Sequence, residues 1–186
     1  PPWPRRENPR KTKVSRANQS MISIIAAVAK NGVIGKNNLM PWHIPEEMQL
    51  FRQLTLGKPL IIGRRTYESL PNMLEGRQLI ILSRNLDFAT GSDAARVARS
   101  IPEALATAKQ FGEEILIGGG ENIYQQFMNK ADRLLISHIK KEYEGDAFFP
   151  GVRYSEWTPI ASENHEEFSF VTYQRAHATS HAARKN

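Results

Sequence analysis

The chain has 186 residues, carries a formal net charge of +6 and contains no cysteine. A chain of this length suits one domain with a sizeable core. Without cysteine it cannot use disulfide or thiolate chemistry. Because no apolar run is long enough to span a membrane and the N-terminus lacks the apolar stretch of a signal peptide, we expect a cytoplasmic protein.

The positive charge lies at the two ends of the chain. Residues 1–20 carry a net +5 and the tail at residues 175–186 carries a net +3, which leaves a net −2 for the expected domain at residues 21–174. We therefore expect no nucleic-acid binding by the domain. Residues 1–20 contain four prolines and no helical or strand period, which is typical of a disordered basic extension. It is either an appended or upstream segment or an arm that binds polyanions.

The first expected strand is a nearly uninterrupted run of small apolar side chains at residues 22–29, broken only by Ser23. This composition indicates a strand buried on both faces. The same pattern recurs at residues 60–62, 79–82, 115–117 and 134–136. The alternation at residues 168–173 predicts an antiparallel strand at an edge of the sheet.

Helical patterns lie between several of these strands, which predicts a largely parallel sheet. The first helix is expected over residues 45–54, and a short second one from Arg65 to just before Pro71. A third begins with Ser100 and Glu103 spaced as a capping box and ends before Gly112. A fourth follows the glycines at residues 118–120. The sequence shows no internal repeat, so we expect a single α/β domain.

Glu47 is the most informative residue of the first expected helix. Apolar residues three, four and seven positions away share its side of the helix: Ile44, Leu50, Phe51 and Leu54. A carboxylate there is costly unless something pairs with it, so Glu47 is expected to line a pocket for a ligand that donates hydrogen bonds. The alternative is an ordinary acid in the first helical turn, because Pro45 fits the first position and an acid favours the positive end of the helix dipole.

Three strand ends are suited to phosphate groups, and ligands of open α/β sheets bind at the carboxyl ends of strands. Residues 63–66 combine the start of a helix with two arginines. Residues 83–84 offer a hydroxyl and a guanidinium, and residues 118–120 are glycines before another helix. Each signal is weak by itself, because tight turns and solvated arginines are common. Together they indicate a phosphate-rich dinucleotide.

Motifs of other chemistries are absent from the sequence, which has no HExxH, GxSxG, GxGxxG or GxxxxGK[ST]. His177 and His181 lie in the tail without an acidic partner, and His138, beside a buried strand, is expected to be a core residue. We therefore predict no metal site. One carboxylate without an evident nucleophile or second acid indicates that a cofactor supplies the chemistry.

Several segments, taken in order, resemble the dihydrofolate reductase family from Met21 to about Tyr173. They are residues 22–29, 32–35, 40–47, 57–69, 80–84, 117–120, 123–124 and 144–150. The resemblance implies a three-layer α/β sandwich whose central, mostly parallel eight-stranded sheet ends in an antiparallel C-terminal strand and is flanked by about four helices. It also implies NADPH-dependent reduction of 7,8-dihydrofolate to tetrahydrofolate in one-carbon metabolism, and binding of antifolates such as trimethoprim. We expect a monomer.

The resemblance assigns a substrate site. Glu47 would accept hydrogen bonds from the pterin N3 and 2-amino groups, while a hydride reaches pterin C6 and a proton reaches N5. Trp42 and Ser137 would hold ordered water and support the acid. Arg77 would bind the α-carboxylate of the glutamate tail, and the carbonyl of Ile117, with that of Ile25, would face the pterin 4-position. The implied wall residues are Ile25, Ala27, Met48, Phe51, Leu70 and Leu74.

The resemblance also assigns a cofactor site. The phosphates would lie on residues 64–66, and the adenosine 2'-phosphate would lie near residues 83–84. Gly118 and Gly119 would form a cis peptide, and a loop at residues 35–40 would close over the cofactor. The full implied set is Ala27, Ile34, Gly35, Asn38, Leu39, Met40, Gly63, Arg64, Arg65, Thr66, Leu82, Ser83, Arg84, Gly118, Gly119, Gly120, Glu121, Asn122, Ile123 and Tyr124.

Two positions depart from the family pattern. Glu47 stands where many bacterial relatives have Asp, and the pair at residues 121–122 stands where some relatives carry an Arg near the pyrophosphate. Two other functions stay open at this point. One is an NADPH-dependent pyrimidine reductase of riboflavin synthesis, whose domains lack the segment at residues 41–47. The other is a noncatalytic nucleotide-binding or nucleic-acid-associated protein that uses the basic extension.

Overall fold

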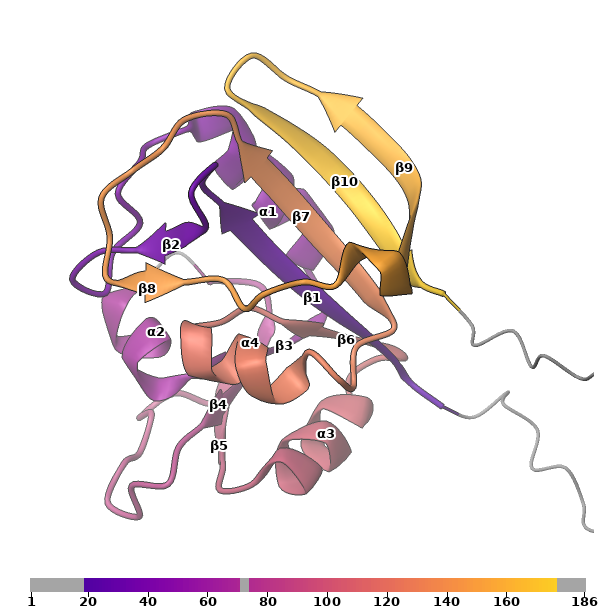
Figure 1. Cartoon of the computed structure of the whole chain (residues 1–186). Helices are drawn as coiled ribbons and strands as arrows, with labels where there is room; N and C mark the ends of the chain where they lie inside the picture. Colours follow the sequence, from indigo (N-terminus) through magenta and orange to yellow (C-terminus); the bar gives the residue numbers. More distant parts are fainter. Residues whose placement is uncertain (1–18, 71–73, 177–186) are drawn as a thin grey trace, which may run out of the picture.

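An eight-stranded sheet forms the centre of the computed structural model, which describes residues 19–70 and 74–176 (Figure 1). Its strand order is β5-β4-β3-β6-β1-β7-β10-β9. In this order, the strands β5, β4, β3, β6, β1 and β7 run parallel to one another. Strand β10 is antiparallel to both β7 and β9. The strands are β1 (Met21–Val28), β3 (Pro59–Gly63), β4 (Gln78–Leu82), β5 (Ala95–Ala98), β6 (Glu114–Ile117), β7 (Arg133–Ile139), β9 (Trp157–Asn164) and β10 (Phe168–Arg175).

Helices cover both faces of this sheet, which confirms the three-layer α/β prediction. α3 and α4 pack on one face, and α1 with Tyr67 of α2 packs on the other (Figure 1). The α-helices of the described residues are α1 (Pro45–Thr55), α2 (Arg64–Ser69), α3 (Ile101–Lys109) and α4 (Glu121–Phe127). The short strands β2 (Val33–Gly35) and β8 (Ala147–Phe148) pair beside the main sheet, and η2 (Tyr154–Glu156) precedes β9.

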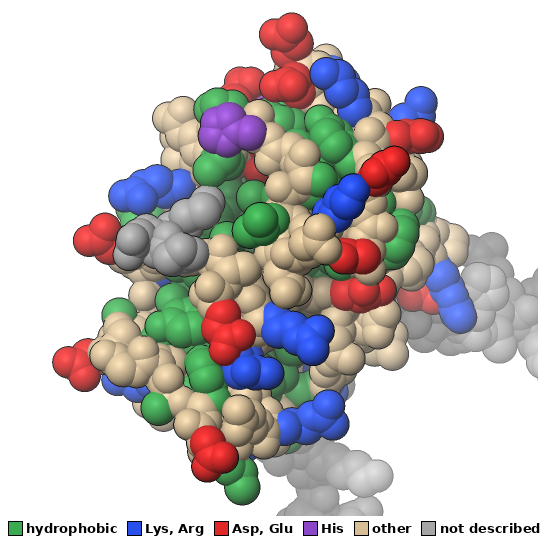
Figure 2. Space-filling model, turned by 90° about the vertical axis from the view of Figure 1, so that its left-hand side faces the viewer, with side chains coloured by type: hydrophobic (Ala, Val, Ile, Leu, Met, Phe, Trp, Pro, Cys, Tyr) green, Lys and Arg blue, Asp and Glu red, His purple; other side chains and the backbone are tan. Residues whose placement is uncertain are grey.

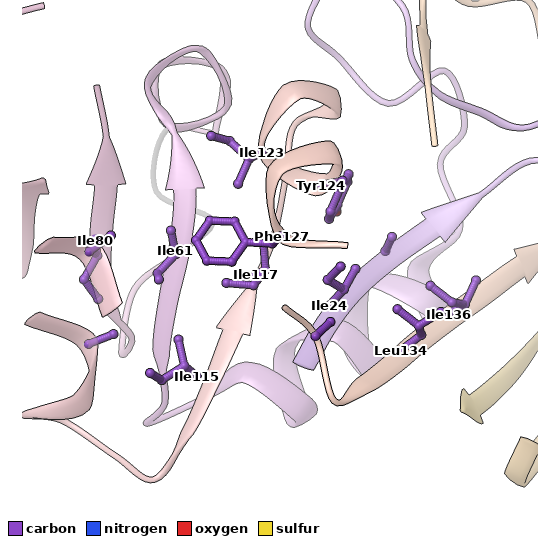
Figure 3. Close-up of a cluster of buried hydrophobic side chains, with 14 of the residues drawn as sticks. Ile24, Ile61, Ile80, Ile115, Ile117, Ile123, Tyr124, Phe127, Leu134 and Ile136 are labelled. Carbon is purple, nitrogen blue, oxygen red and sulfur yellow. The ribbon is translucent and has the colours of Figure 1, made fainter. Parts of the chain in front are cut away.

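Successive residues of the central strands feed the two opposite faces, as expected of strands buried on both sides. Ile24 and Ile61 belong to the cluster under α4, where Phe127 is fully buried against them (Figure 3). Ile25 and Leu60, one position along each strand, belong to the cluster under α1. This double burial fixes the ends of β1 and β3, where the sequence predicts ligand binding.

The helix starts follow the sequence signals. Pro45 occupies the start of α1, and the Ser100 hydroxyl caps α3 by accepting a hydrogen bond from the Glu103 N–H at 3.3 Å. The Glu103 carboxylate in turn accepts from the Arg99 N–H at 2.8 Å. Residues 1–18 and 177–186, which include most of the predicted extension and tail, lie outside the described residues.

The prediction of an edge position for the last strand is wrong. β10 pairs with β7 on one side and with β9 on the other, so β9 is the edge strand. Seven of the eight residues of β9 are exposed, which explains why it carries no buried-strand pattern. β5 escaped prediction for a related reason: it has four residues, and its second, Arg96, is exposed.

Candidate active site

A cleft of about 1760 Å³ lies at the carboxyl ends of β1, β3, β4 and β6 and is bounded by α1, α2 and the start of α4. Every predicted site residue lines it except Ser137 and Ile117. Figure 2 shows the side of the molecule that carries α2, β2 and β8, where hydrophobic side chains lie among basic and acidic ones. The strand-end rule therefore located the cleft correctly.

Glu47 lies in this cleft and is only 5% exposed. It occupies the first turn of α1 and is buried there, while its pairing with a ligand stays a prediction. Burial raises the pKa of Glu47, because a carboxylate loses hydration in the protein interior, while a hydrogen bond from the Ser137 hydroxyl acts in the opposite direction. Ser137 is 3% exposed and stands behind the acid on β7, beside Ala27 of β1.

Two further buried side chains line the cleft, Tyr124 and Trp42. The Tyr124 hydroxyl donates to the Ile25 carbonyl at 2.8 Å. Burial raises the pKa of Tyr124, and the negative charge of Glu47 raises it further. The Tyr124 hydroxyl of α4 and the Glu47 carboxylate of α1 therefore interact electrostatically. Trp42 is 8% exposed, and its buried Nε1 has no hydrogen-bond partner among the described residues. Its ring packs edge-on against Tyr143, with the centroids 5.2 Å apart.

Glycines form the opposite wall of the cleft, where β3 and β6 end side by side. The Gly118 N–H donates to the Ile61 carbonyl at 2.9 Å, and the Gly63 N–H donates to the Gly119 carbonyl at 2.8 Å. A Cβ on Gly118 would lie 2.9 Å from the Leu60 side chain, which would have to shift to accommodate a larger residue. The close approach of two glycine-lined strand ends presents bare backbone to the cleft, as a pyrophosphate requires.

The cis peptide lies between Gly119 and Gly120, one residue later than predicted. Gly118 is still bound to β3 through its N–H and Gly119 through its carbonyl, so the chain leaves the sheet only after Gly119. Gly119 adopts a positive φ of 102°, which favours glycine. Gly120 is the N-cap of α4 and lies against Thr66, whose Oγ1 would be 3.2 Å from a Cβ at this position.

The loop at residues 35–40 borders the cleft and is held by the segment that precedes β8. The Asn37 N–H donates to both oxygens of Asp146 at 3.2 and 3.0 Å, and the Lys36 ammonium lies 3.0 Å from Glu144. A Cβ on Gly145 would lie 2.3 Å from Val33 Cγ1, so this residue must be glycine for the two segments to pack. Parts of both segments belong to the stretches that resemble the family, but nothing in the sequence indicates that the two segments touch.

Arg99 is a cleft residue that sequence reasoning did not identify. Its guanidinium donates to the carbonyls of Ser83 and Leu86 at 3.2 Å each and of Phe88 at 3.1 Å, and it also donates to that of Asn85. One side chain thus orders the turn that follows β4. The sequence signal for Arg99 is its position directly after β5, which lies beside β4. This position was missed because β5 was not predicted. Further lining residues that were not predicted are Ala26, His43, Gln49, Arg52, Ser69, Asn85, Ser100, Ile101, Gln126, Asp146 and Ala147.

Two predicted residues need a more specific description. Arg77 lines the cleft, but its Nε donates to Thr55 Oγ1 at 2.8 Å and its guanidinium carbon lies 5.6 Å from the centre of the Phe51 ring. This side chain is 2% exposed and is fixed by the protein itself. Ile117 is fully buried in the core under α4, so its side chain does not reach the cleft, and the contact predicted for its carbonyl stays a prediction.

Comparison with known proteins agrees with this geometry. A family model described as dihydrofolate reductase matches residues 21–176. The chain belongs to the dihydrofolate reductase family. Dihydrofolate reductase of Neisseria gonorrhoeae is 46% identical over 137 residues, which cover 73% of this chain and 83% of that protein. Dihydrofolate reductase of Neisseria meningitidis serogroup A is 42% identical over 161 residues, with 83% and 98% covered.

A solved dihydrofolate reductase structure has the same fold. The enzyme from Enterococcus faecalis, in complex with NADP(H) and RAB-propyl, superimposes with a TM-score of 0.76 at 31% identity, covering 84% of this chain and 97% of that one. The family resemblance and the fold predicted from it are therefore confirmed. Within residues 19–70 and 74–176, no helix is long and apolar enough to cross a membrane, and no group of acidic and histidine side chains could hold a metal ion.

Proposed function

We propose that the cleft binds dihydrofolate against α1 and NADPH against the ends of β3, β4 and β6. As a member of the dihydrofolate reductase family, the protein reduces 7,8-dihydrofolate to 5,6,7,8-tetrahydrofolate with NADPH. The observation that carries the residue assignment is the Glu47 carboxylate, 5% exposed and facing the cleft. Such an acid requires hydrogen-bond donors, and the pterin N3 and 2-amino groups supply two.

Glu47 orients and polarises the pterin in this proposal, and water delivers the proton to N5. The acid contacts the N3 end of the ring, several bonds from N5, so direct transfer is out of reach. Burial raises the pKa of Glu47, whereas the two pterin donors favour its ionised form. The buried Trp42 Nε1, which has no partner among the described residues, is suited to bind a water molecule beside the acid. The Ser137 hydroxyl donates a hydrogen bond to Glu47 and so fixes the position of the carboxylate.

The remaining substrate contacts follow from the lining of the cleft. Apolar side chains of α1 and of the segment after α2 would wall the pterin and benzoyl groups: Met48, Phe51, Leu70 and Leu74. We assign the glutamate tail of the substrate to Arg77, because a guanidinium already held by Thr55 and the Phe51 ring presents a fixed charge to a carboxylate.

NADPH, when bound, supplies the hydride that passes from nicotinamide C4 to pterin C6. The residues present fit this cofactor, because the glycine wall at residues 118–120 leaves room for a pyrophosphate and the start of α2 adds two guanidinium groups. Ser83 and Arg84 are assigned to the 2'-phosphate, and Ala27 and Ile34 to the border of the nicotinamide. The loop at residues 35–40, with the exposed Leu39, would cover the cofactor.

The partners of the protein are small molecules in this proposal: dihydrofolate, NADPH and antifolates such as trimethoprim. We propose a cytoplasmic monomer whose catalytic domain is residues 21–174. Removing residues 1–20 should therefore leave kcat and KM unchanged, as measured side by side with the full chain. An activity that disappears with those residues, or a salt-sensitive affinity for polyanions that disappears with them, would instead support an arm-driven binder.

Absorbance of NADPH tests the function directly. Purified full-length protein should oxidise NADPH only when dihydrofolate is added, and the rate should fall when trimethoprim is present. A phosphoribosylated aminopyrimidine, the substrate class of the pyrimidine reductases, serves as the matched control and should give no oxidation. Loss of absorbance with that control and not with dihydrofolate would overturn the proposal.

A further inference from the structure

His165 joins two parts of the fold that are far apart in the sequence. It lies in the turn between β9 and β10, and its Nδ1 is 2.7 Å from a carboxylate oxygen of Glu46 in the first turn of α1. Its Nε2 is 3.6 Å from a carboxylate oxygen of Glu163. The imidazole stacks on the Phe168 ring, with the centroids 4.3 Å apart, and its side chain is 19% exposed.

Both ring nitrogens of His165 lie near carboxylate oxygens. Carboxylates only accept hydrogen bonds, and both ring nitrogens face one. A neutral imidazole donates from one nitrogen, whereas an imidazolium donates from both. Nε2 is buried and has no hydrogen-bond partner among the described residues, and a Glu163 carboxylate oxygen lies 3.6 Å from it. The nearby ammonium of Lys140 faces the His165 main-chain carbonyl instead, to which it donates a hydrogen bond.

The contact bears on the acid of the active site through the helix. Glu46 and Glu47 are consecutive residues of the first turn of α1, and they point in different directions: the side chain of Glu46 is 60% exposed and meets the hairpin, whereas Glu47 is buried in the cleft. No side chain caps this end of α1, and Pro45 offers no N–H. The hairpin formed by β9 and β10 therefore holds, through His165, a first helical turn that has no side-chain cap.

We propose that His165 is a positioning residue, which holds Glu46 through the 2.7 Å contact and thereby fixes the first turn of α1 where Glu47 meets the pterin. This inference rests on the proposed role of Glu47. The ion pair is present when His165 is protonated and weakens as the pH rises, because a neutral imidazole makes a weaker bond to a carboxylate. Since Glu46 is largely exposed, the effect on KM for dihydrofolate is modest, about two- to fivefold.

The experiment measures kcat and KM for dihydrofolate between about pH 5 and pH 9 in five proteins. They are the wild type, His165→Gln, Glu46→Gln, the variant that combines these two substitutions, and the control Glu163→Gln. A glutamine at position 165 can still donate to Glu46 but cannot carry a charge. We expect its KM to exceed that of the wild type by about two- to fivefold at the acidic end and to equal it at the alkaline end. KM for NADPH should stay unchanged.

The control keeps the contact with α1 and should change KM less than twofold at any pH. Combining His165→Gln with Glu46→Gln should add nothing to either single change, because both remove the same ion pair. Since the side chain of Glu46 is exposed, Glu46→Gln is expected to fold even if His165→Gln does not. Parallel pH profiles for wild type and both variants, with a change in thermal stability alone, would overturn the inference. A wild type without dihydrofolate-dependent oxidation of NADPH would refute the proposed function instead.

Discussion

The substitution Glu47→Gln tests the proposed substrate contact, because it removes the charge with little change in size. Glu47 is 5% exposed, so its bonds to the pterin form away from water. Hydrogen bonds to charged groups contribute about 1.5–3 kcal/mol each, and two are proposed. Glutamine keeps one acceptor oxygen and turns an amide donor toward the other pterin donor. We therefore expect kcat/KM for dihydrofolate to fall by about 3–4 kcal/mol, which is about 100- to 1,000-fold.

The same substitution should stabilise the ligand-free protein at neutral pH. Burial raises the pKa of Glu47 above its usual value of 4.5. An acid of this kind stabilises the folded state most when both states are protonated, below the unfolded pKa, and this contribution is lost as the pH rises through the folded pKa. The glutamine protein lacks this loss. Its advantage in the free energy of unfolding should therefore be absent at acidic pH and grow as the pH rises.

Three measurements test these expectations for Glu47→Gln. Oxidation of NADPH gives kcat/KM for dihydrofolate, quenching of protein fluorescence gives the dissociation constant of NADPH, and urea unfolding at several pH values gives stability. NADPH affinity should stay within about twofold of the wild type, since Glu47 is assigned to the pterin alone. A loss of kcat/KM smaller than about tenfold at neutral pH would refute the reasoning, because less than one charged hydrogen bond would then be missing.

Three further substitutions probe the rest of the cleft. Glu47→Asp should tighten inhibition by trimethoprim about tenfold while changing KM for dihydrofolate less, since the shorter acid leaves room for the diaminopyrimidine; equal inhibition constants would contradict this. Arg99→Gln should raise KM for NADPH about tenfold and leave KM for NADH unchanged, because the turn after β4 loses its four carbonyl contacts; a proportional change for both cofactors would argue against a role near the 2'-phosphate. Gly145→Ala should lower the free energy of unfolding by about 1–3 kcal/mol, as its Cβ would lie 2.5 Å from the Gly35 carbonyl; urea unfolding that matches the wild type would show that the segments separate freely.

Features that depend on a local pattern of residues could be predicted from the amino-acid sequence. Buried strands appear as apolar runs, helix starts as Pro45 and Ser100, and the acid on an apolar helix face as Glu47. The ordered family segments added the cofactor and the substrate, and nearly all the residues they implied line one cleft. These features could be predicted because each is encoded within about ten neighbouring residues.

Contacts between residues that are far apart in the chain depend on the fold and carry no local signal. The Tyr124 hydroxyl reaches the Ile25 carbonyl across 99 positions, and His165 reaches Glu46 across 119. Arg99 acts on the turn after β4 only because β5 lies beside β4 in the sheet. Strand order and register set these contacts, and an exposed edge strand such as β9 or a four-residue strand such as β5 carries too little apolar pattern to reveal them.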